Sequence, residues 1–355
     1  MKLALISYLH GAGGAERQII LLANEMTYRN HEVHLIILCD NKAPYPIENT
    51  VIIHNLSNVE KGNKLDIFRR YLSLRKVIKT IKPDITINYN FQGVYFSLLI
   101  GKKYTGKVLY SERGDPYDKE YSGLLGVIRY FSVKIIDAFV FQSEGARDFF
   151  KIKETQRAII IHNSVTVSPN KYPIVKHRDN RIVSVGRLHP QKNQMLLIDS
   201  FSKIADKYPN LNLEIYGDGE LKKTLQDKIN NLHLQHRVNL LPSRKDIFDC
   251  IRTARLFVLT SDYEGMPNSL MEAMALGLPC ISTDCRPGGA KTLIENGVNG
   301  FIVPLRDSNA IASKIEYLID NPSIAGFIAN NAQHIVETHT NEVIFDRWNN
   351  FLLSL

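Results

Sequence analysis

Short apolar runs alternate with helix-like runs along this sequence, and this alternation restricts the possible folds more than any other feature. Residues 3–8 form the first apolar run, which a glycine-containing loop and a helix-like segment follow. The alternation continues to about residue 163 and restarts at Arg181. Such alternation predicts parallel sheets with helices on both faces. We therefore expect an α/β fold of two doubly wound, Rossmann-like domains that face each other across a cleft.

The segment between the two alternating halves has a different composition. Residues 164–180 have the sequence SVTVSPNKYPIVKHRDN, which is rich in proline, asparagine and charge. Such a segment predicts a loop or linker. We expect a first domain at residues 1–165, a linker at 166–180 and a second domain at 181–340, and a length of 355 residues suits two domains.

The net charge of +8 predicts an anionic partner, for which nucleic acid, an acidic membrane surface and a phosphorylated substrate are the options. No helix-turn-helix, RNA-recognition or zinc-finger pattern supports nucleic acid. No apolar run approaches the roughly 18 residues of a membrane helix, and the N-terminal LALISYL predicts a strand, not a signal peptide. The four scattered cysteines predict free thiols in a reducing cytosol.

The stretch EGMPNSLME places two carboxylates, Glu264 and Glu272, on either side of a glycine- and proline-containing turn. We expect Glu264 at the carboxyl end of a buried strand, 256–260, and Glu272 in the first turn of the next helix. Ligands of parallel sheets bind beyond the carboxyl ends of strands, and helix N-termini attract anions. The pattern therefore indicates a ligand with hydroxyls and phosphates. The alternative is a capping box formed by Ser269 and Glu272.

Two further loops follow strands in the same way. Gly13 and Gly14 lie between the first strand and a helix, which suits a phosphate cradled by backbone amides, although a plain tight turn is the alternative. Arg187 and Lys192, in GRLHPQKN, follow the first strand of the second half. An arginine and a lysine in that position suit a diphosphate, and two solvated loop cations are the alternative.

Charged residues also mark two features of the first half. Residues 64–82 predict a helix with an exposed cationic face, which is either an ordinary solvated face or a surface for anionic lipid or pyrophosphate. The predicted cationic face comprises Arg69, Arg70, Arg75, Lys76, Lys79 and Lys82. The predicted buried face comprises Ile67, Leu72, Leu74, Val77, Ile78 and Ile81. The second feature is SERGDP, whose charged residues follow a strand at 107–111 and are either functional or part of a simple loop.

These segments together resemble the family 4 retaining glycosyltransferases, which have the GT-B fold. In the second half the resemblance lies in VGRLHPQKN, EGMPNSLMEAMALGLPCIST and GGAKTLIENGVNGFIVP, in that order. In the first half it lies in GGAER and SERGDP, which look most like bacterial members that build O-antigen, capsule or exopolysaccharide. The resemblance implies that the final helix, residues 341–355, crosses back onto the first domain.

The resemblance implies a role for each matched residue. The amide of Gly14, beside Gly13, would meet the donor phosphate or sugar. Arg187 and Lys192 would bind the diphosphate, Glu264 the donor sugar and Glu272 the ribose. The amides that would hold phosphate and sugar hydroxyls belong to Gly265, Met266, Pro267, Asn268 and Ser269. The predicted catalytic residues are Glu264, Arg187 and Lys192, and candidates for acceptor binding are Glu112, Arg113 and Asp115.

The resemblance further implies a nucleotide-sugar donor, most often UDP-linked, with no metal and no other cofactor. The sequence contains no Asp-x-Asp triplet, so cations and helix dipoles would neutralise the leaving diphosphate. One departure is the histidine that many members carry after the fourth strand, where this chain has INYNFQG with Asn90. His10 precedes the glycine loop but does not occupy that place, and no catalytic histidine is assigned.

We expect retaining transfer of a hexose or N-acetylhexosamine to a growing, lipid-linked surface glycan. The expected location is the cytoplasmic face of the membrane, where the cationic first domain would meet anionic lipid, without a nucleic-acid partner. Two alternatives stay open, a nucleotide-sugar epimerase or hydrolase of the same fold and a non-catalytic nucleotide-sugar-binding subunit. An epimerase would act without an acceptor, and a binding subunit would show affinity without turnover.

Overall fold

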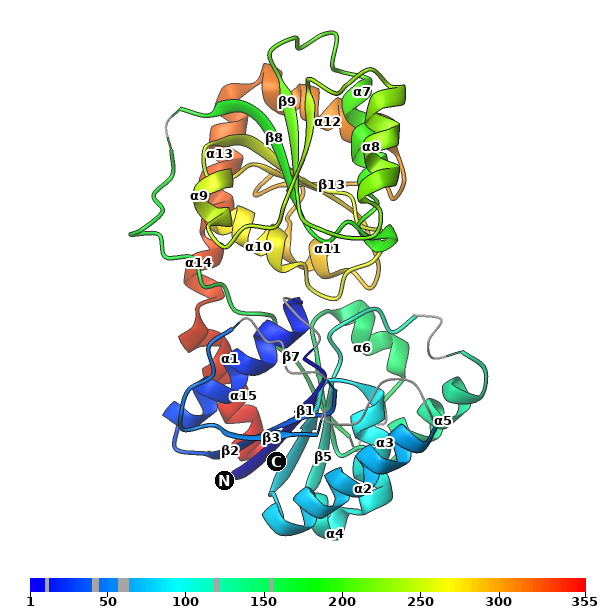
Figure 1. The fold of residues 1–355 in the computed structure, drawn as a ribbon. Coiled ribbons are helices and arrows are strands. Elements are labelled where there is room, and N and C mark those ends of the chain that lie inside the picture. The colour runs from blue at the N-terminus through cyan, green and yellow to red at the C-terminus, as the bar shows by residue number, and fades with distance from the viewer. Residues whose placement is uncertain (10–12, 40–44, 57–63, 118–121, 153–155, 176) are drawn as a thin grey trace. The chain divides into compact units, whose positions relative to one another are not determined.

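The computed structural model describes residues 1–9, 13–39, 45–56, 64–117, 122–152, 156–175 and 177–355. The described chain divides into two compact units, shown in Figure 1. Unit 1 comprises Met1–Ser164 and Asn341–Leu355, and unit 2 comprises Val165–Thr340. The segment predicted as a linker falls in unit 2, and the first strand of that unit already begins at Asp179.

Unit 1 contains a seven-stranded sheet in which every neighbouring pair is parallel, in the order β3-β2-β1-β4-β5-β6-β7. Its strands are β1 (Lys2–Ser7), β2 (Glu32–Ile37), β3 (Ile52–Asn55), β4 (Ile85–Asn88), β5 (Lys107–Ser111), β6 (Ala138–Phe141) and β7 (Arg157–Ile160). The order runs outward from β1 in both directions, which is the doubly wound arrangement.

Helices cover both faces of this sheet. They are α1 (Gly14–Tyr28), α2 (Lys64–Ile81), α3 (Phe91–Ile100), α4 (Lys102–Thr105), α5 (Gly123–Val133), α6 (Glu144–Phe150) and α15 (Asn341–Ser354). Alternate residues of β1 pack on opposite faces of the sheet, because successive side chains of a strand point to opposite sides. Leu3 and Leu5 join the core beneath α1 and α15, whereas Ala4 and Ile6 join the core beneath α2 and α3.

Unit 2 contains a six-stranded parallel sheet in the order β10-β9-β8-β11-β12-β13. Its strands are β8 (Asp179–Val185), β9 (Asn212–Tyr216), β10 (Val238–Leu241), β11 (Ala254–Leu259), β12 (Cys280–Thr283) and β13 (Phe301–Val303). Its helices are η2 (Pro190–Lys192), α7 (Gln194–Ser202), α8 (Lys222–Asn231), α9 (Ile247–Ile251), α10 (Asn268–Ala275), α11 (Gly289–Leu293), α12 (Ser308–Asp320), α13 (Pro322–Gln333) and α14 (Ile335–Thr338). Each unit is therefore a doubly wound α/β domain, which confirms the predicted fold class.

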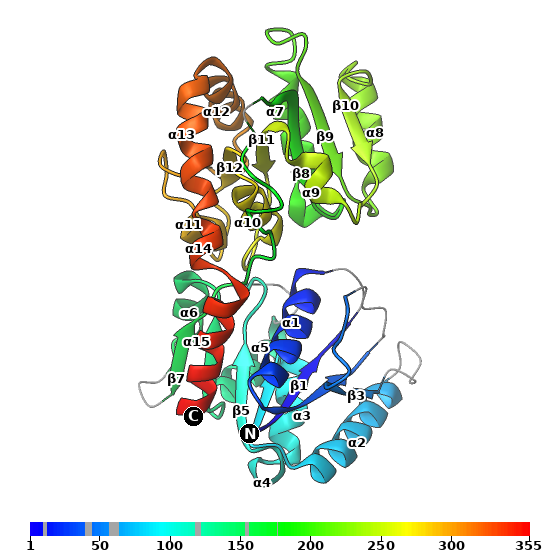
Figure 2. The same cartoon turned by 90° about the vertical axis from the view of Figure 1, so that its left-hand side faces the viewer.

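The C-terminal helix α15 belongs to unit 1 although the chain has passed through unit 2 (Figure 2). It contacts α1, and Phe345 and Trp348 are buried in the core that β1 and β2 share. Arg29 at the end of α1 pairs with Asp346, with 2.8 Å between Nη2 and Oδ1. Helix α15 therefore completes one face of the first sheet.

Helix α2 forms where its sequence predicts it, but the predicted exposure of three of its residues is wrong. Arg70 is buried, whereas Ile67 and Leu72 are exposed. Arg70 stands four residues before Leu74 and eight before Ile78, so it shares the stripe that faces the sheet. Leu72 stands two residues before Leu74 and therefore points away from that stripe. Within the described residues, no helix combines the length and apolar character needed to cross a bilayer.

Candidate functional site

The loops that follow β8, β11 and β12 meet at the carboxyl edge of the second sheet. Their backbones touch at Gly289, because a Cβ atom built there would lie 2.0 Å from the carbonyl oxygen of Gly265. A Cβ atom at Gly217, after β9, would likewise lie 2.0 Å from the carbonyl oxygen of Gly186. Only glycine permits such approach, so these positions let polar loops converge on one small region.

Hydrogen bonds brace the loop after β8 against the loop after β11. The hydroxyl of Thr260 donates to the carbonyl oxygens of Lys192 and Asn193, at 3.0 Å each. The side-chain amide of Gln191 donates to the carbonyl oxygen of Tyr263 at 2.9 Å. These bonds join side chains to backbone, so they fix where the two loops place their charged residues.

Lys192 and Glu264 form an ion pair between the braced loops. The hydroxyl of Ser261 donates to the same carboxylate at 2.7 Å, and the stem of Lys192 lies 3.4 Å from the Cβ position of Gly186. Both charged groups are largely shielded from solvent. Burial raises the pKa of the Cys285 thiol to about 12, and the Glu264 carboxylate nearby adds to that rise. The site therefore holds two opposite charges next to each other and shielded from solvent.

Arg187 occupies the same loop as Lys192 but is exposed. The side-chain amide of Gln194 donates to its carbonyl oxygen at 2.8 Å, which fixes its backbone. No carboxylate among the described residues pairs with its guanidinium, so its charge is open to an anion. The predicted residues Arg187, Lys192 and Glu264 thus lie on two loops that are tied together.

Helix α10 corrects two predictions about Glu272. The helix begins at Asn268 with Pro267 as its N-cap, and the amides of Leu270 and Met271 both donate to the Pro267 carbonyl at 3.1 Å. Glu272 is therefore the fifth helical residue and not part of the first turn. Ser269 is the second helical residue, so the capping-box interpretation, which needs a serine at the N-cap, is also wrong. Glu272 is buried along the helix, and of the predicted 265–269 segment only Asn268 and Ser269 are helical, while residues 265–267 precede the helix.

In unit 1, Gly13 is the N-cap of α1 and Gly14 is its first residue. A carboxylate oxygen of Glu16 lies 2.0 Å from the position of a Cβ atom at Gly13, so this side chain folds back over the glycine. An anion at the start of α1 would have to share that space with Glu16. Gly13 and Gly14 belong to unit 1, while the other predicted donor residues belong to unit 2. His10 lies outside the described residues.

Glu112 follows β5 and is bonded within its own loop. Its carboxylate accepts hydrogen bonds of 2.8 Å from the hydroxyl of Tyr110 and from the amide of Gly114. Burial raises the pKa of Glu112 above the ordinary value of a glutamate. Asp115 is also buried, and it accepts a hydrogen bond of 3.1 Å from the amide of Tyr117. These contacts give both carboxylates structural partners, and acceptor binding stays a prediction.

Arg113 ties the carboxyl edge of the first sheet to the C-terminal helix. Its Nε atom donates to the hydroxyl of Ser111 at 2.8 Å and its Nη1 atom to the Asn163 side chain at 3.0 Å. Its guanidinium carbon lies 4.7 Å from the ring centre of Tyr89 and 5.4 Å from that of Trp348. Burial lowers the pKa of Arg113. The contact with Trp348 could not be predicted, because 235 positions separate the two residues.

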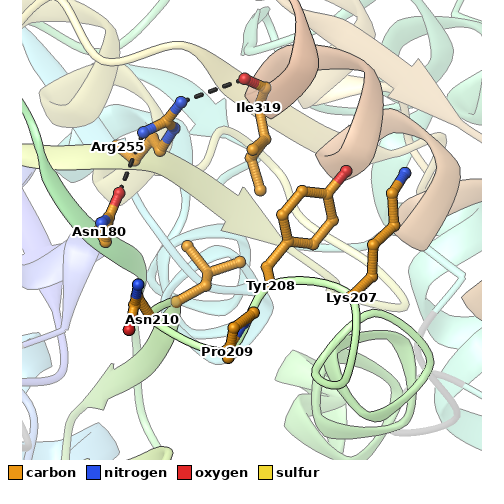
Figure 3. A pocket seen from close by; sticks show the side chains of 8 residues that line it. Asn180, Lys207, Tyr208, Pro209, Asn210, Arg255 and Ile319 are labelled. Carbon is orange, nitrogen blue, oxygen red and sulfur yellow. Dashed lines mark hydrogen bonds between the residues drawn. The ribbon is translucent and has the colours of Figure 1, made fainter.

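The sequence interpretation also missed Thr260, Ser261 and Gln191, the polar side chains that hold the site of unit 2. Ser261 and Thr260 directly follow a buried strand, and that position is the signal that identifies them. A separate pocket, shown in Figure 3, lies at the amino ends of the strands, where Arg255 donates to Asn180 at 3.0 Å and to the Ile319 carbonyl at 3.1 Å. Among the described residues, no group of three histidine, cysteine, aspartate or glutamate side chains is placed to hold a metal ion.

Known proteins resemble this chain over its whole length. Residues 170–335 match the family described as Glycosyl transferases group 1, and residues 12–168 match Glycosyltransferase Family 4. A Haemophilus influenzae protein named as an uncharacterized glycosyltransferase is 28% identical, with 98% of each chain covered. A Campylobacter jejuni relative is 25% identical, with 98% of this chain and 97% of its own covered. Its name is GalNAc-alpha-(1->4)-GalNAc-alpha-(1->3)-diNAcBac-PP-undecaprenol alpha-1,4-N-acetyl-D-galactosaminyltransferase.

The fold is also found among solved structures. Anabaena HepE in complex with UDP superimposes with a TM-score of 0.81 at 20% identity, and all of both chains is covered. The same protein has been solved with UDP-glucose. Two doubly wound units, two adjoining family matches and this likeness agree with one another. The chain therefore belongs to the family 4 glycosyltransferases and has the GT-B fold.

Proposed function

We propose that this glycosyltransferase moves a hexose or N-acetylhexosamine from a UDP-sugar, with retention of configuration, to a growing glycan on a lipid diphosphate. The observation that carries the proposal is the Lys192–Glu264 pair, which two braced loops hold at the carboxyl edge of the second sheet. The name of the Campylobacter relative, with its undecaprenol diphosphate acceptor, supports the acceptor class. The UDP and UDP-glucose complexes of HepE support the donor class.

In this proposal, cations and dipoles receive the donor diphosphate. The exposed guanidinium of Arg187 makes a bidentate contact, and the ammonium of Lys192 bridges a phosphate oxygen and the Glu264 carboxylate. The N-terminus of α10, eight residues long, adds backbone amides and the positive end of its dipole. Glu264 accepts hydrogen bonds from the donor sugar, Glu272 accepts them from the ribose, and the amide of Gly14 meets the phosphate or sugar.

The reaction breaks the bond between the anomeric carbon and the diphosphate oxygen while the acceptor hydroxyl forms its bond on the same face of the sugar. The departing phosphate oxygen takes the proton of that hydroxyl. Negative charge grows on the diphosphate in the transition state, so fixed cations in a site with little water lower the barrier. This arrangement needs no metal ion, and transfer should therefore proceed in the presence of EDTA.

Product analysis tests the proposal. The protein is incubated with a panel of UDP-, GDP- and ADP-sugars and EDTA, with and without a polyprenyl diphosphate glycan, and the linkage formed is examined by NMR. We expect an α-linked product from one α-configured UDP-sugar, only when the acceptor is present. Sugar interconversion or free sugar without an acceptor would indicate an epimerase or hydrolase. Donor binding without turnover on any acceptor would indicate a binding subunit.

The same proposal places the protein at the inner face of the cytoplasmic membrane, where a lipid-linked acceptor is available. The exposed cations of α2, Arg69, Arg75 and Lys76, would meet anionic lipid there. Exchanging these three for glutamate should weaken binding to anionic vesicles at low salt. Unchanged binding would remove α2 from the membrane surface without affecting the proposed transfer reaction.

A further inference from the structure

Helix α5 turns its apolar side chains toward solvent. Leu124, Ile128 and Phe131 are exposed, and Ile135, just beyond the helix, continues the same stripe. Their spacing of four, three and four residues places them on one face. We call these four residues the α5 apolar stripe. Val127 and Tyr130 beside it are exposed as well, so the apolar surface is wider than a single row.

The opposite face of α5 turns inward and carries a serine, a valine and an arginine. Ser132 and Val133 are buried, and Arg129 turns inward to donate to the Pro116 carbonyl at 2.9 Å. Its guanidinium carbon also lies 4.9 Å from the ring centre of Phe149. An ordinary surface helix shows the reverse arrangement, with charges outward and apolar residues inward. Contiguous exposed apolar surface of this kind marks an interaction site.

The charges around the stripe favour a lipid surface over another protein. Residues 122–136 contain two charged residues, both cations, and since Arg129 turns inward, Lys134 is the exposed one. Lys134 is exposed with its ammonium 4.0 Å from the ring centre of Tyr130. A tyrosine and a lysine that flank an apolar stripe suit the headgroup level of a membrane. A second copy of this chain across a twofold axis on the stripe would instead bring Lys134 from both copies to one apolar surface.

We propose that α5 inserts the α5 apolar stripe into an anionic bilayer, with Tyr130 and Lys134 at the level of the lipid headgroups. Helix α3 contacts both α2 and α5, and the three helices cover the same face of the first sheet (Figure 1). The exposed cations of α2 therefore lie on the same helix layer as α5 and add electrostatic attraction to anionic lipid. The inference rests on the proposed function only in its reason for a membrane, which is access to a lipid-linked acceptor.

A matched pair of variants tests the insertion. Leu124 and Phe131 are 76% and 57% exposed, whereas Leu353 and Phe327, on α15 and α13, are 60% and 55% exposed. The test variant is Leu124→Ser/Phe131→Ser, and the control is Leu353→Ser/Phe327→Ser. Each is mixed with vesicles of equal parts phosphatidylcholine and phosphatidylglycerol, at low and high salt, and sedimented. We expect the test variant to lose vesicle affinity at least about tenfold at both salt concentrations, with the control unchanged.

Equal vesicle binding by test variant and wild type would overturn the inference, as would wild-type binding that high salt abolishes completely. A wild-type dimer that only the test variant dissociates would identify a second copy as the partner of the stripe. Transfer to a short-chain, water-soluble acceptor is measured alongside and should be the same in both variants. If the wild type transfers no sugar while the vesicle result holds, the proposed function fails and the membrane inference stands.

Discussion

The carboxyl edges of the two sheets both carry charged residues, but they use them differently. After β5, the head groups of Glu112 and Arg113 are occupied by Tyr110, Gly114, Ser111 and Asn163. After β8, the bonds that hold the loop come from Thr260 and Gln191 to backbone, and the guanidinium of Arg187 stays exposed. A charged residue that follows a strand is therefore a candidate for ligand binding only when side chains other than its own hold the loop in place.

This difference separates binding from stability. Changes at the second sheet's edge should impair turnover, because the charges there are held ready for a ligand. Changes at the first sheet's edge should lower the free energy of unfolding, because the charges there hold the unit together. Each of the following variants tests one side of that comparison.

The largest effect is expected for Lys192→Ala. Removing a fixed cation from the leaving diphosphate should lower kcat by about 100-fold or more, which steady-state assays at saturating donor measure. The control is Lys223→Ala, because Lys223 is an exposed residue on α8 paired with Asp227 at 3.0 Å. Turnover within a fewfold of the wild type in Lys192→Ala would mean that the ion pair with Glu264 is structural.

Arg113→Met should act on stability. The variant removes two hydrogen bonds and the stacking on Tyr89 and Trp348, so the free energy of unfolding should fall by about 2 kcal/mol. Urea denaturation followed by the fluorescence of Trp348, the only tryptophan in the chain, measures this change. Arg147→Met, at a partly exposed site on α6, is the control. An unchanged midpoint with a raised KM for the acceptor would instead make Arg113 a binding residue.

The smallest effect is the pH dependence due to Glu112. Burial raises the pKa of this carboxyl in the folded chain, so the folded chain holds the proton more tightly than the unfolded chain does. That contribution to stability is present below the ordinary glutamate range and is lost as the pH rises toward the folded value, by up to about 1.4 kcal/mol per pH unit. In Glu112→Gln this loss should disappear when unfolding is followed across the same acidic range. Parallel pH curves for the variant and the wild type would contradict the assignment.

The sequence predicted the two doubly wound units and the convergence of Arg187, Lys192 and Glu264, because strand–loop–helix order determines which loops share a sheet edge. The prediction was wrong where packing and capping determine which side chains are buried and where a helix begins. The charge of Arg70 predicts an exposed position on α2, whereas its place on the stripe of Leu74 and Ile78 buries it. Glu272 is predicted in the first turn of α10, but the helix begins earlier, at Asn268, because Pro267 serves as its N-cap.

Contacts between segments that lie far apart in the sequence could not be predicted either. The stacking of Arg113 on Trp348 depends on α15 packing against unit 1 after the whole of unit 2 has intervened. The sequence does not predict the exposed apolar stripe of α5, because a helix pattern shows which residues share a face and not which face meets the sheet. The exposure of the stripe residues and the inward position of Arg129 show that this helix is turned with its apolar side outward.

The most direct test is a thermal-shift titration with UDP of the wild type, Lys192→Ala, Glu272→Ala and Arg113→Met. At about 100 times its dissociation constant, UDP should stabilise the wild type by roughly 2.7 kcal/mol. The account predicts that this shift is lost in Lys192→Ala and Glu272→Ala and kept in Arg113→Met, despite its lower starting stability. A shift that survives in the first two variants and disappears in Arg113→Met would contradict the division between a binding edge and a structural edge.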